Sequence, residues 1–268
     1  MVTRSRFTRL SLRTALVLFT LACLWVGKIS LDARRQQAVV AWVAKQGGMV
    51  IYDWQQDEKT LQITIKENPT PPWLRGALGD DYFQTVVGVS VSRRKLRDLS
   101  PLADLPRLRI LRASDVGINS VEALAALREL KMLILSDNEI MDLGPLAELQ
   151  KLETLQLDNN DIVDLSPLRG LGRLETLIID GNKISDVAPL GELPNLKALD
   201  MSENPVRDLA PLKTLPRIEM IRCTEGKIVD CSPLFDLPTL LIADLHGNAG
   251  LSKEDDVKLQ NHLGRPRD

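Results

Sequence analysis

Hydrophobic and polar residues repeat along most of this chain with a constant period of 22 residues that begins at Val86. Eight copies follow without gaps, and positions one, four and six of each copy are mostly apolar. Positions four and six share the parity of a strand with one buried face. Leu occupies position seventeen in seven copies, at residues 102, 124, 146, 168, 190, 212 and 234. A constant period over this length predicts a stack of similar coils rather than a single globular core.

Polar residues recur at fixed positions between the apolar ones. Position thirteen is usually Asp and position sixteen usually Pro, which suits a capped turn followed by a short helical segment. Position nine carries an amide that can satisfy backbone groups buried between stacked coils. We interpret these amides as a structural Asn ladder: Asn138, Asn160, Asn182, Asn204 and Asn248.

The pattern LxxLxLxxNxIxDxxPLxxL resembles the 22-residue class of leucine-rich repeats found in internalin-type proteins. The resemblance covers residues 86 to about 250. It implies an α/β solenoid with a parallel sheet on the concave face and short 3₁₀ or helical turns on the convex face. We therefore expect repeats over 86–250, closed by a capping helix and tail over 251–268 with Ser252 as the N-cap.

The first 31 residues combine a basic head with an apolar run, TALVLFTLACLWVG at 14–27. This layout is typical of a signal peptide or a signal anchor. The uncharged run is shorter than the roughly 20 residues that span a bilayer, but Leu10–Leu31 suffices if Arg13 and Lys28 reach the two interfaces. We expect an uncleaved single-pass anchor in the cytoplasmic membrane, with the repeats on the extracytoplasmic side. Cleavage of the segment, followed by secretion, is the alternative.

The segment between the apolar run and the repeats has a different composition. All four Trp and both Tyr of the chain precede residue 86. Residues 32–46 predict a helix that ends at Gly47-Gly48, and MVIYDW and LQITIKE predict two strands joined by a charged turn, as in a hairpin. A Pro-led short helix in PPWLRGALGDDYFQ then leads into the first repeat. We interpret 32–85 as a small α+β cap over the open core of the first coil.

The N-terminal passage also resembles a group of bacterial membrane-anchored leucine-rich-repeat proteins. The residues that carry this resemblance are SLRTALVLFTLACLWVG, ARRQQAVVAWVAKQGGMVIYDW and PPWLRGALGDDYFQTVVGV. It implies an apolar anchor that leads through a helix and a small strand element into the repeats. Because the biochemical role of that group is generally unassigned, the resemblance implies no mechanism.

Charge and chemistry narrow the classes of function. The first 31 residues carry five bases and no acid, so the remainder holds 34 − 5 = 29 bases against 36 acids. This acidic balance argues against nucleic acid as a partner. The chain has two His, three Cys without a CxxC motif, and no catalytic motif, so we predict no enzyme, cofactor or metal site. The least favoured alternative is an enzyme with a site in the cap, around Asp53, Asp80 and Asp81.

Outward positions of the predicted sheet suggest a surface for a protein or peptide partner with basic and apolar groups. An apolar centre with a polar rim is typical of interfaces. The alternatives are that branched residues merely suit strands and acids keep the surface soluble, or that the protein self-associates in the cell envelope. The apolar candidates are Ile110, Met132, Ile134 and Ile178, and the acidic candidates are Asp115, Asp137, Asp158, Asp180, Glu203 and Glu225.

Overall fold

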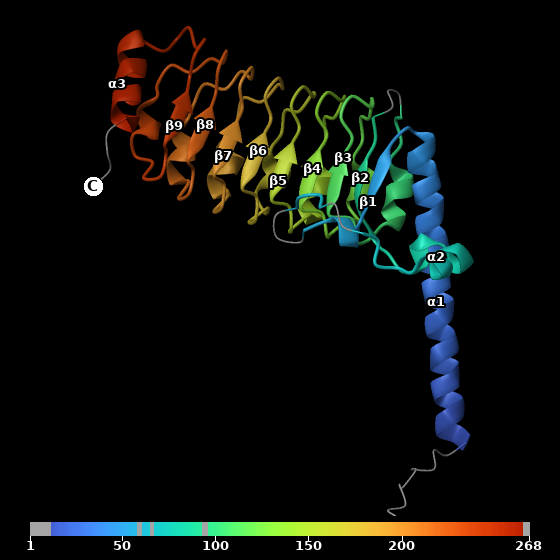
Figure 1. The fold of residues 1–268 in the computed structure, drawn as a ribbon. Coiled ribbons are helices and arrows are strands. Elements are labelled where there is room, and N and C mark those ends of the chain that lie inside the picture. The colour runs from blue at the N-terminus through green and yellow to red at the C-terminus, as the bar shows by residue number, and fades with distance from the viewer. Residues whose placement is uncertain (1–11, 58–60, 65–66, 93–95, 265–268) are drawn as a thin grey trace, which may run out of the picture.

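The computed structural model describes residues 12–57, 61–64, 67–92 and 96–264. Its strands form one sheet in chain order, and each repeat contributes one strand (Figure 1). β1 is antiparallel to β2, and β2 to β9 are parallel. This architecture confirms the predicted α/β solenoid. The strands are β1 Met49–Tyr52, β2 Val86–Ser90, β3 Ile110–Arg112, β4 Met132–Ile134, β5 Thr154–Gln156, β6 Thr176–Ile178, β7 Ala198–Asp200, β8 Met220–Arg222 and β9 Ile242–Asp244.

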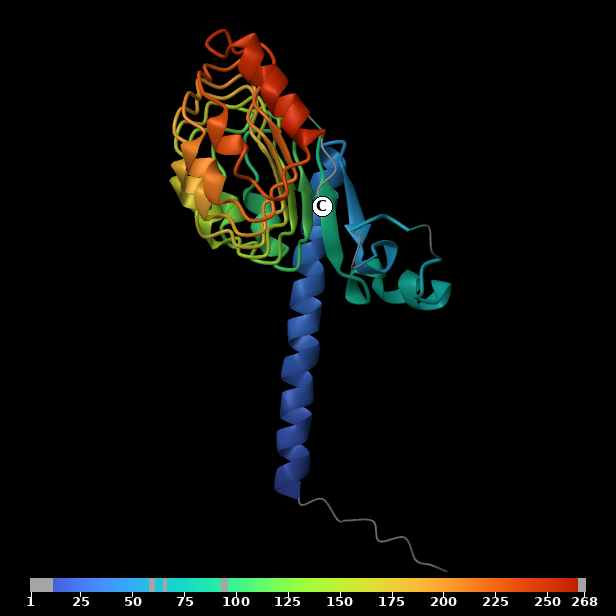
Figure 2. The same cartoon turned by 90° about the vertical axis from the view of Figure 1, so that its left-hand side faces the viewer.

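Short 3₁₀ turns form the side of each coil that lies opposite the sheet (Figure 2). The Asp at position thirteen starts them: Ser166 donates its backbone N–H and its hydroxyl to Asp164, at 2.8 and 2.7 Å. These bonds stabilise the charged carboxylate and lower the pKa of Asp164. The turns are η3 Ser100–Asp104, η4 Glu122–Leu124, η5 Gly144–Glu148, η6 Ser166–Leu168, η7 Ala188–Glu192, η8 Ala210–Thr214 and η9 Ser232–Leu234.

The core between sheet and turns is a stack of leucine layers. Leu133, Leu155 and Leu177 occupy the same strand position in successive coils, in register, and each has no exposed surface. Burying one such side chain contributes about 2 kcal/mol. Each layer is covered by the next, so the core has open surfaces only at its two ends.

Asn side chains join neighbouring coils at the turn after each strand. Asn160 donates its amide to the carbonyls of Leu135 and Leu157, at 3.1 and 3.0 Å. Its Oδ1 accepts the backbone N–H of Ile140 at 3.0 Å. One buried amide therefore satisfies backbone groups of two coils that water cannot reach.

Helix α1, Leu12–Lys45, covers the first coil with its C-terminal part and projects from the folded body with its N-terminal part (Figures 1 and 2). Ala33, Val39 and Val43 of its C-terminal part are at most 3% exposed. The helix predicted over residues 32–46 is the C-terminal part of α1, which continues without a break from the apolar run because no helix-breaking residue interrupts 28–45. Arg4, Arg6 and Arg9 of the predicted basic head lie outside the described residues.

The rest of the cap departs from the predicted two-strand hairpin. β1 pairs with β2 instead, so the first repeat strand gains a partner for its free edge. The described residues of LQITIKE form no strand and make one antiparallel bridge, between Gln56 and Ile63. The remaining elements of the cap are η1 Asp53–Gln55, α2 Pro72–Leu78 and η2 Asp80–Tyr82.

Helix α3, Lys253–Leu263, lies across the last coil at the other end of the stack (Figure 1). Ser252 accepts the backbone N–H of Asp255 at 3.1 Å, which makes it the N-cap that the sequence predicted. Leu259 is fully buried, and Gln260 donates to the carbonyl of Ala243 at 2.9 Å. Both ends of the leucine core are thus covered by helices.

Candidate partner-binding surface

The sheet face comprises the side chains at repeat positions three and five, which point away from the leucine core. Most of them are half-buried by their neighbours in the same column. Ile110 is an exception, because it has no exposed surface. It therefore cannot contact a partner, and its assignment to the binding surface is corrected.

The cap explains the burial of Ile110. Cap elements lie against the sheet face beside the first strands (Figure 2). A Cβ added to Gly88 would meet the Ile51 side chain at 2.8 Å, so Ile51 occupies the space above Gly88. Gly88 pairs with Ile110 in the sheet. Gly88 of β2 and Ile110 of β3 are therefore withdrawn from the candidate surface.

The remaining apolar candidates do not form a continuous patch. Met132 and Ile134 lie together on β4, whereas Ile178 lies on β6. Gln156 of β5 separates Ile134 from Ile178 in the same column. The apolar candidates on the sheet face thus form two small areas with a polar residue between them.

The acidic stripe runs along the ends of the strands, at repeat positions seven and eight. Position eight has a left-handed backbone, with φ of 52° at Asp115, 57° at Asp137, and 53° at both Glu203 and Glu225. Asn and Gly tolerate this conformation well, but Glu adopts it rarely. The repeat geometry therefore places these carboxylates outward at a turn that Asp tolerates and Glu does not favour.

Four acids of neighbouring coils act on one another in the middle of the stripe. Burial raises the pKa of Asp180 to about 6, and the charges of Asp158, Asp200 and Glu203 add to the increase. Asp158 itself accepts the hydroxyl of Ser136 at 2.6 Å. In the middle of the stripe, burial and the neighbouring acids therefore disfavour the charged form of Asp180.

The sequence interpretation missed a charged group at position five. Arg222 of β8 forms an ion pair with Asp200 of β7 at 2.9 Å, and its Nε lies 4.0 Å from Asp244 of β9. The signal was present in the sequence, since all three residues occupy position five. It went unused because only the apolar side chains of positions three and five were considered as candidates there.

Solved structures decide the family. The crystal structure of internalin C2 from Listeria monocytogenes is 35% identical, with a TM-score of 0.58, over 63% of this chain and 74% of that one. A family profile described as Leucine Rich repeats (2 copies) matches residues 128–170 and 172–214. The chain belongs to the internalin-type leucine-rich-repeat proteins.

Two further structures resemble this leucine-rich-repeat protein. Another Listeria monocytogenes internalin is 26% identical with a TM-score of 0.60, over 65% of this chain and 50% of that one. The chain thus spans half the length of that internalin. A leucine-rich-repeat protein of Leptospira interrogans, at 21% identity, TM-score 0.58 and coverage of 63% and 44%, shares the fold. No curated protein matches the sequence significantly. The fold is typically a non-catalytic scaffold for protein interaction.

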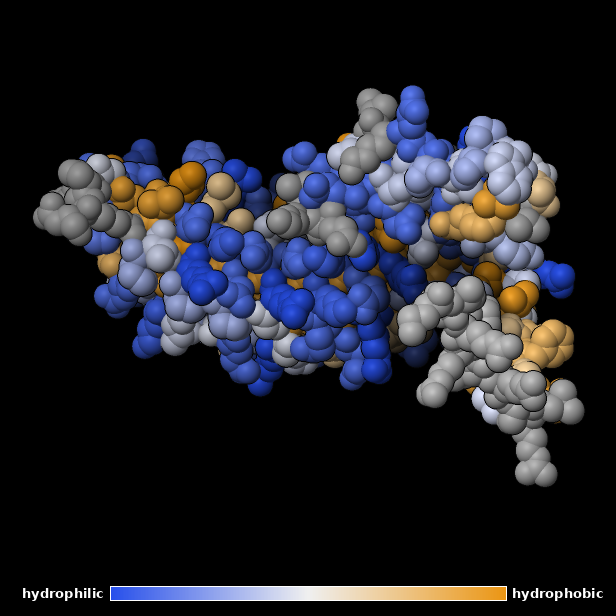
Figure 3. Space-filling view, turned by 60° about the horizontal axis from the view of Figure 1, so that its bottom comes forward, coloured by the Kyte–Doolittle hydropathy of each residue, from blue (hydrophilic) through white to orange (hydrophobic). Residues whose placement is uncertain are grey.

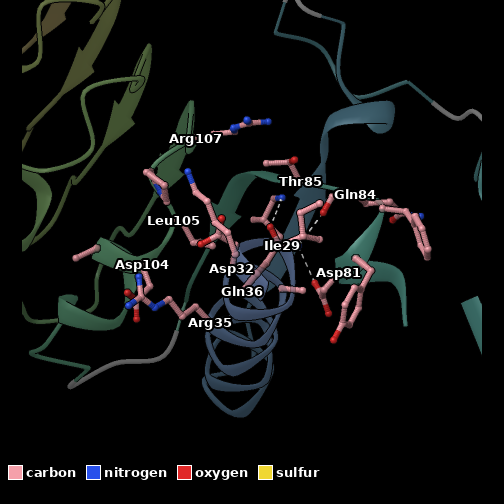
Figure 4. A pocket seen from close by; sticks show the side chains of 17 residues that line it. Ile29, Asp32, Arg35, Gln36, Asp81, Gln84, Thr85, Asp104, Leu105 and Arg107 are labelled. Carbon is pink, nitrogen blue, oxygen red and sulfur yellow. Dashed lines mark hydrogen bonds between the residues drawn. The ribbon is translucent and has the colours of Figure 1, made fainter. Parts of the chain in front are cut away.

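A groove lies where α1 leaves the folded body of this leucine-rich-repeat protein (Figure 4). It has a volume of 690 Å³ and lies between α1, the segment from Asp81 to Val86, and the residues around the end of η3. Its charged lining residues are Lys28, Asp32, Arg35, Asp81, Asp104 and Arg107. Three bases and three acids make the groove neutral, which does not favour a highly charged small ligand.

The acids of the cap have structural partners. Asp81 accepts the amide of Gln36 at 2.8 Å, and Asp80 accepts that of Gln84 at 3.4 Å. Burial, followed by the charges of Asp81 and Asp80, raises the pKa of Tyr52 to about 12. Asp53 accepts the N–H of Trp54 at 3.0 Å. These contacts order the cap.

Other reactive groups are placed for packing. Cys223 is fully buried and Cys231 is 2% exposed, and burial raises the pKa of Cys223 to about 12. His262 packs edge-on against Phe235 with ring centroids 5.2 Å apart. The described residues contain no group of three or more His, Cys, Asp or Glu side chains that could hold a metal ion.

α1 of this leucine-rich-repeat protein is long and apolar enough to cross a membrane, by length and composition alone. Its most apolar window has a mean hydropathy of 1.9 and is not buried against the body. Phe19 and Trp25 are 67% and 65% exposed. A signal sequence has the same properties, so α1 is compatible with either an anchor or a signal peptide.

Proposed function

We propose that this protein is a non-catalytic binding module displayed at a membrane, which holds a protein or peptide on the concave face of its repeats. Residues 1–31 serve as the anchor, 32–85 as the cap, 86–250 as the binding solenoid, and 251–268 as the terminal capping helix and tail. The repeats face the extracytoplasmic side. The partner presents basic groups to the acidic stripe and apolar groups to Met132, Ile134 and Ile178.

The observation that carries this proposal is the mutual repulsion in the acidic stripe. The raised pKa of Asp180 reports a carboxylate whose charge is made unfavourable first by burial, and then by repulsion from Asp158, Asp200 and Glu203. A Lys or Arg of a partner at this place relieves the repulsion and favours the charged form of Asp180. A cationic partner therefore gains more here than on an evenly charged surface.

The repeat architecture supports a large ligand rather than a small one. The sheet face is an open surface of half-buried side chains, and the groove that the structure contains lies outside it. Leucine-rich-repeat and other solenoids use such extended surfaces for binding. A peptide or a protein domain can contact several strands at once, which spreads the binding energy over Met132, Gln156 and Ile178.

The test is capture of partners by crosslinking in intact cells with the full chain. Asp158→Asn together with Asp180→Asn removes two charges at nearly constant shape. Glu122→Gln with Asp236→Asn is the matched control, because both residues are exposed on the turn side of the coils. We expect the stripe variant to lose at least about tenfold in captured partner, and the control to lose little.

The result has three distinct readings. Equal capture by the two variants would remove the acidic stripe from the proposal. Capture of further copies of the chain itself would support self-association in place of a foreign partner. Release of the chain from membranes by carbonate washing would show that residues 1–31 are a signal peptide rather than an anchor.

A further inference from the structure

The coils have a fixed orientation relative to α1. In Figure 1 the N-terminal part of α1 projects from one side of the coil stack, and the repeat strands run away from that side. Lys28 of α1 and Arg107, which precedes β3, line the same groove. The residues that precede each strand therefore face the side from which α1 projects. We call the side chains at positions 21, 22 and 2 around β3 to β9 the lower edge.

The lower edge carries an excess of positive charge. Its bases outnumber its acids by eight to four. The excess remains, at ten to eight, when positions 18 and 19 of the same coils are included. The bases are Arg107, Arg109, Arg128, Lys131, Lys151, Arg173, Lys197 and Arg217, and the acids are Glu129, Glu153, Glu175 and Glu219.

The opposite edge has the reverse charge. We define the upper edge as positions seven, eight and ten after the strands β3 to β9, which leaves out residues 93–95 because they are not described. Eight acids outnumber two bases there. The bases are Lys183 and Lys227, and the acids are Asp115, Asp137, Glu139, Asp158, Asp161, Asp180, Glu203 and Glu225. The solenoid is thus polarised across its width, with its basic side toward the projecting part of α1.

Ion pairs within the lower edge occupy three of its four acids, Glu129, Glu153 and Glu175, and leave bases over. Lys151 lies 2.6 Å from Glu129, and Lys131 lies 3.1 Å from Glu153. By contrast, Arg107 and Arg173 have no ion pair among the described residues. Both are exposed, so their charges are available to an external anion. Figure 3 views the molecule from this side and shows a hydrophilic surface along the coils.

A membrane surface is the anion that the position of the lower edge indicates. The uncharged run of α1 ends before Lys28, so a bilayer that contains this run has its headgroups at the level of Lys28. The groove lined by Lys28 lies at the end of the lower edge that is next to α1, and the coils extend sideways from it (Figures 1 and 4).

We propose that the lower edge is a docking surface for anionic phospholipid headgroups. It holds the solenoid alongside the membrane, with the acidic stripe turned away from the lipid. This inference rests on the proposed insertion of α1. Basic side chains near an anionic surface are attracted and acidic ones repelled, so the two edges favour the same orientation. In the docked orientation the sheet face stands upright on the membrane and points sideways. A partner can therefore reach it by moving along the membrane surface.

Energy transfer between the far end of the solenoid and the lipid tests this orientation. The full chain, with Cys23→Ser and a donor dye on Asn261→Cys of α3, is inserted into vesicles that contain a headgroup-labelled lipid. Asn261 is exposed, while Cys223 and Cys231 are buried and react poorly. Vesicles of phosphatidylcholine alone are compared with vesicles that also contain phosphatidylglycerol. We expect higher transfer with phosphatidylglycerol, and a decrease when added salt shortens the Debye length.

Two triple variants with the same net charge separate the lower edge from general electrostatics. Arg107→Gln, Arg173→Gln and Arg217→Gln remove exposed bases of the lower edge. Lys183→Gln, Arg207→Gln and Lys227→Gln remove exposed bases from the other side of the coils. We expect the first variant to lower the ratio of docked to lifted solenoid by at least about tenfold, because each base contributes several-fold at an anionic surface. The second variant leaves transfer at or above the level of the unchanged chain.

Flotation of the same samples with the vesicles identifies which inference fails. Equal transfer on both vesicle types, or an equal loss in both variants, contradicts the docking surface. If the chain still floats with the vesicles in that case, the proposed anchor is retained. Failure to float with either vesicle contradicts the anchor and the docking surface together. Transfer that depends on phosphatidylglycerol and falls only in the lower-edge variant supports the proposal.

Discussion

The middle coils and the cap both shield apolar side chains from water, but they use different contacts. In the coils, each leucine layer and each Asn repeats the contacts of its neighbours. In the cap, one set of unique contacts surrounds Gln36 and Gln84. Gln36 donates to Asp81 and to the carbonyl of Gln84, at 2.8 and 2.9 Å, and accepts the N–H of Val86 at 2.9 Å.

The two regions also differ in how completely they satisfy their polar groups. The buried amide of Asn160 uses both its oxygen and its nitrogen. Gln56 of the cap is 4% exposed, yet neither Oε1 nor Nε2 has a partner among the described residues. In the repeats, one arrangement of buried amides satisfies the backbone groups of coil after coil. The cap has no such repeated arrangement, and it leaves the buried amide of Gln56 without a partner among the described residues. The following changes test this difference, from the largest effect to the smallest.

Leu155→Ala removes a fully buried side chain from the middle of the leucine stack. We expect the free energy of unfolding to fall by about 4 kcal/mol, because the coils on both sides hold the cavity open. Val43→Ala at the cap has a smaller expected effect, about 2 kcal/mol. Urea unfolding of the full chain in detergent measures both, with the exposed Val163→Ala as the control. A larger loss at Val43 would reverse the comparison.

Asn160→Ala leaves buried backbone groups of two coils without partners. We expect a loss of about 3 kcal/mol, since each unsatisfied group costs about 1 kcal/mol or more. Asn119→Ala, at an exposed position of the second copy, should change the unfolding midpoint very little. The idea that the ladder joins coils would be untenable if the two variants unfolded alike.

Gln36→Ala removes the central amide of the cap network. We expect a loss of about 2 kcal/mol, with faster hydrogen exchange confined to β1, β2 and the first coil. Gln37→Ala changes the exposed neighbour on the same helix and provides the control. Exchange that accelerates equally throughout the repeats would show that the cap and the coils are one cooperative unit.

Gln56→Leu replaces a buried amide that has no partner with an apolar side chain of similar size. We expect stabilisation by about 1 kcal/mol, because the desolvated amide gains nothing in return for burial. Gln56→Glu should destabilise the protein instead, since it buries a charge at the same place. Thermal unfolding of both variants decides the matter, and a destabilised Gln56→Leu would reveal a partner for this amide.

Asp180→Asn tests a place where repetition works against stability. The folded pKa of Asp180, about 6, lies above its ordinary value of 3.8. The folded state therefore binds more protons between these values, and this group's contribution to stability declines as pH rises through the window. We expect the variant to exceed the unchanged chain at pH 7 by less than about 1 kcal/mol, given solvent screening, and to match it near pH 4. Parallel stability curves would remove the repulsion from the argument.

Most of the repeat region followed from the sequence because its interactions are local and periodic. The period places Leu133 and Leu155 in neighbouring layers without knowledge of any distant contact. The hydrogen bonds of Asp164 to Ser166 span two residues and were readable in the same way. Even the capping helix α3 was marked by Ser252 and the acidic turn that follows it.

Contacts between the cap and the repeats could not be predicted from the sequence. Ile110 had the periodicity of an exposed strand position, and only the approach of Ile51 over Gly88 shows that the cap covers this part of the sheet. The pairing of β1 with β2, rather than with LQITIKE, depends in the same way on a free strand edge that exists only after the coils have stacked.

The sequence by itself determined that this protein is a solenoid of eight coils, because a fixed period dictates which residues are buried in each coil. Only the tertiary structure decided which of the outward residues remain exposed and which edge of the coils lies toward α1. The cap covers Gly88 and Ile110 on the sheet face, and the packing of α1 on the first coil decides which edge faces the side from which the apolar helix projects. Both depend on contacts between residues far apart in the chain, which no local pattern encodes.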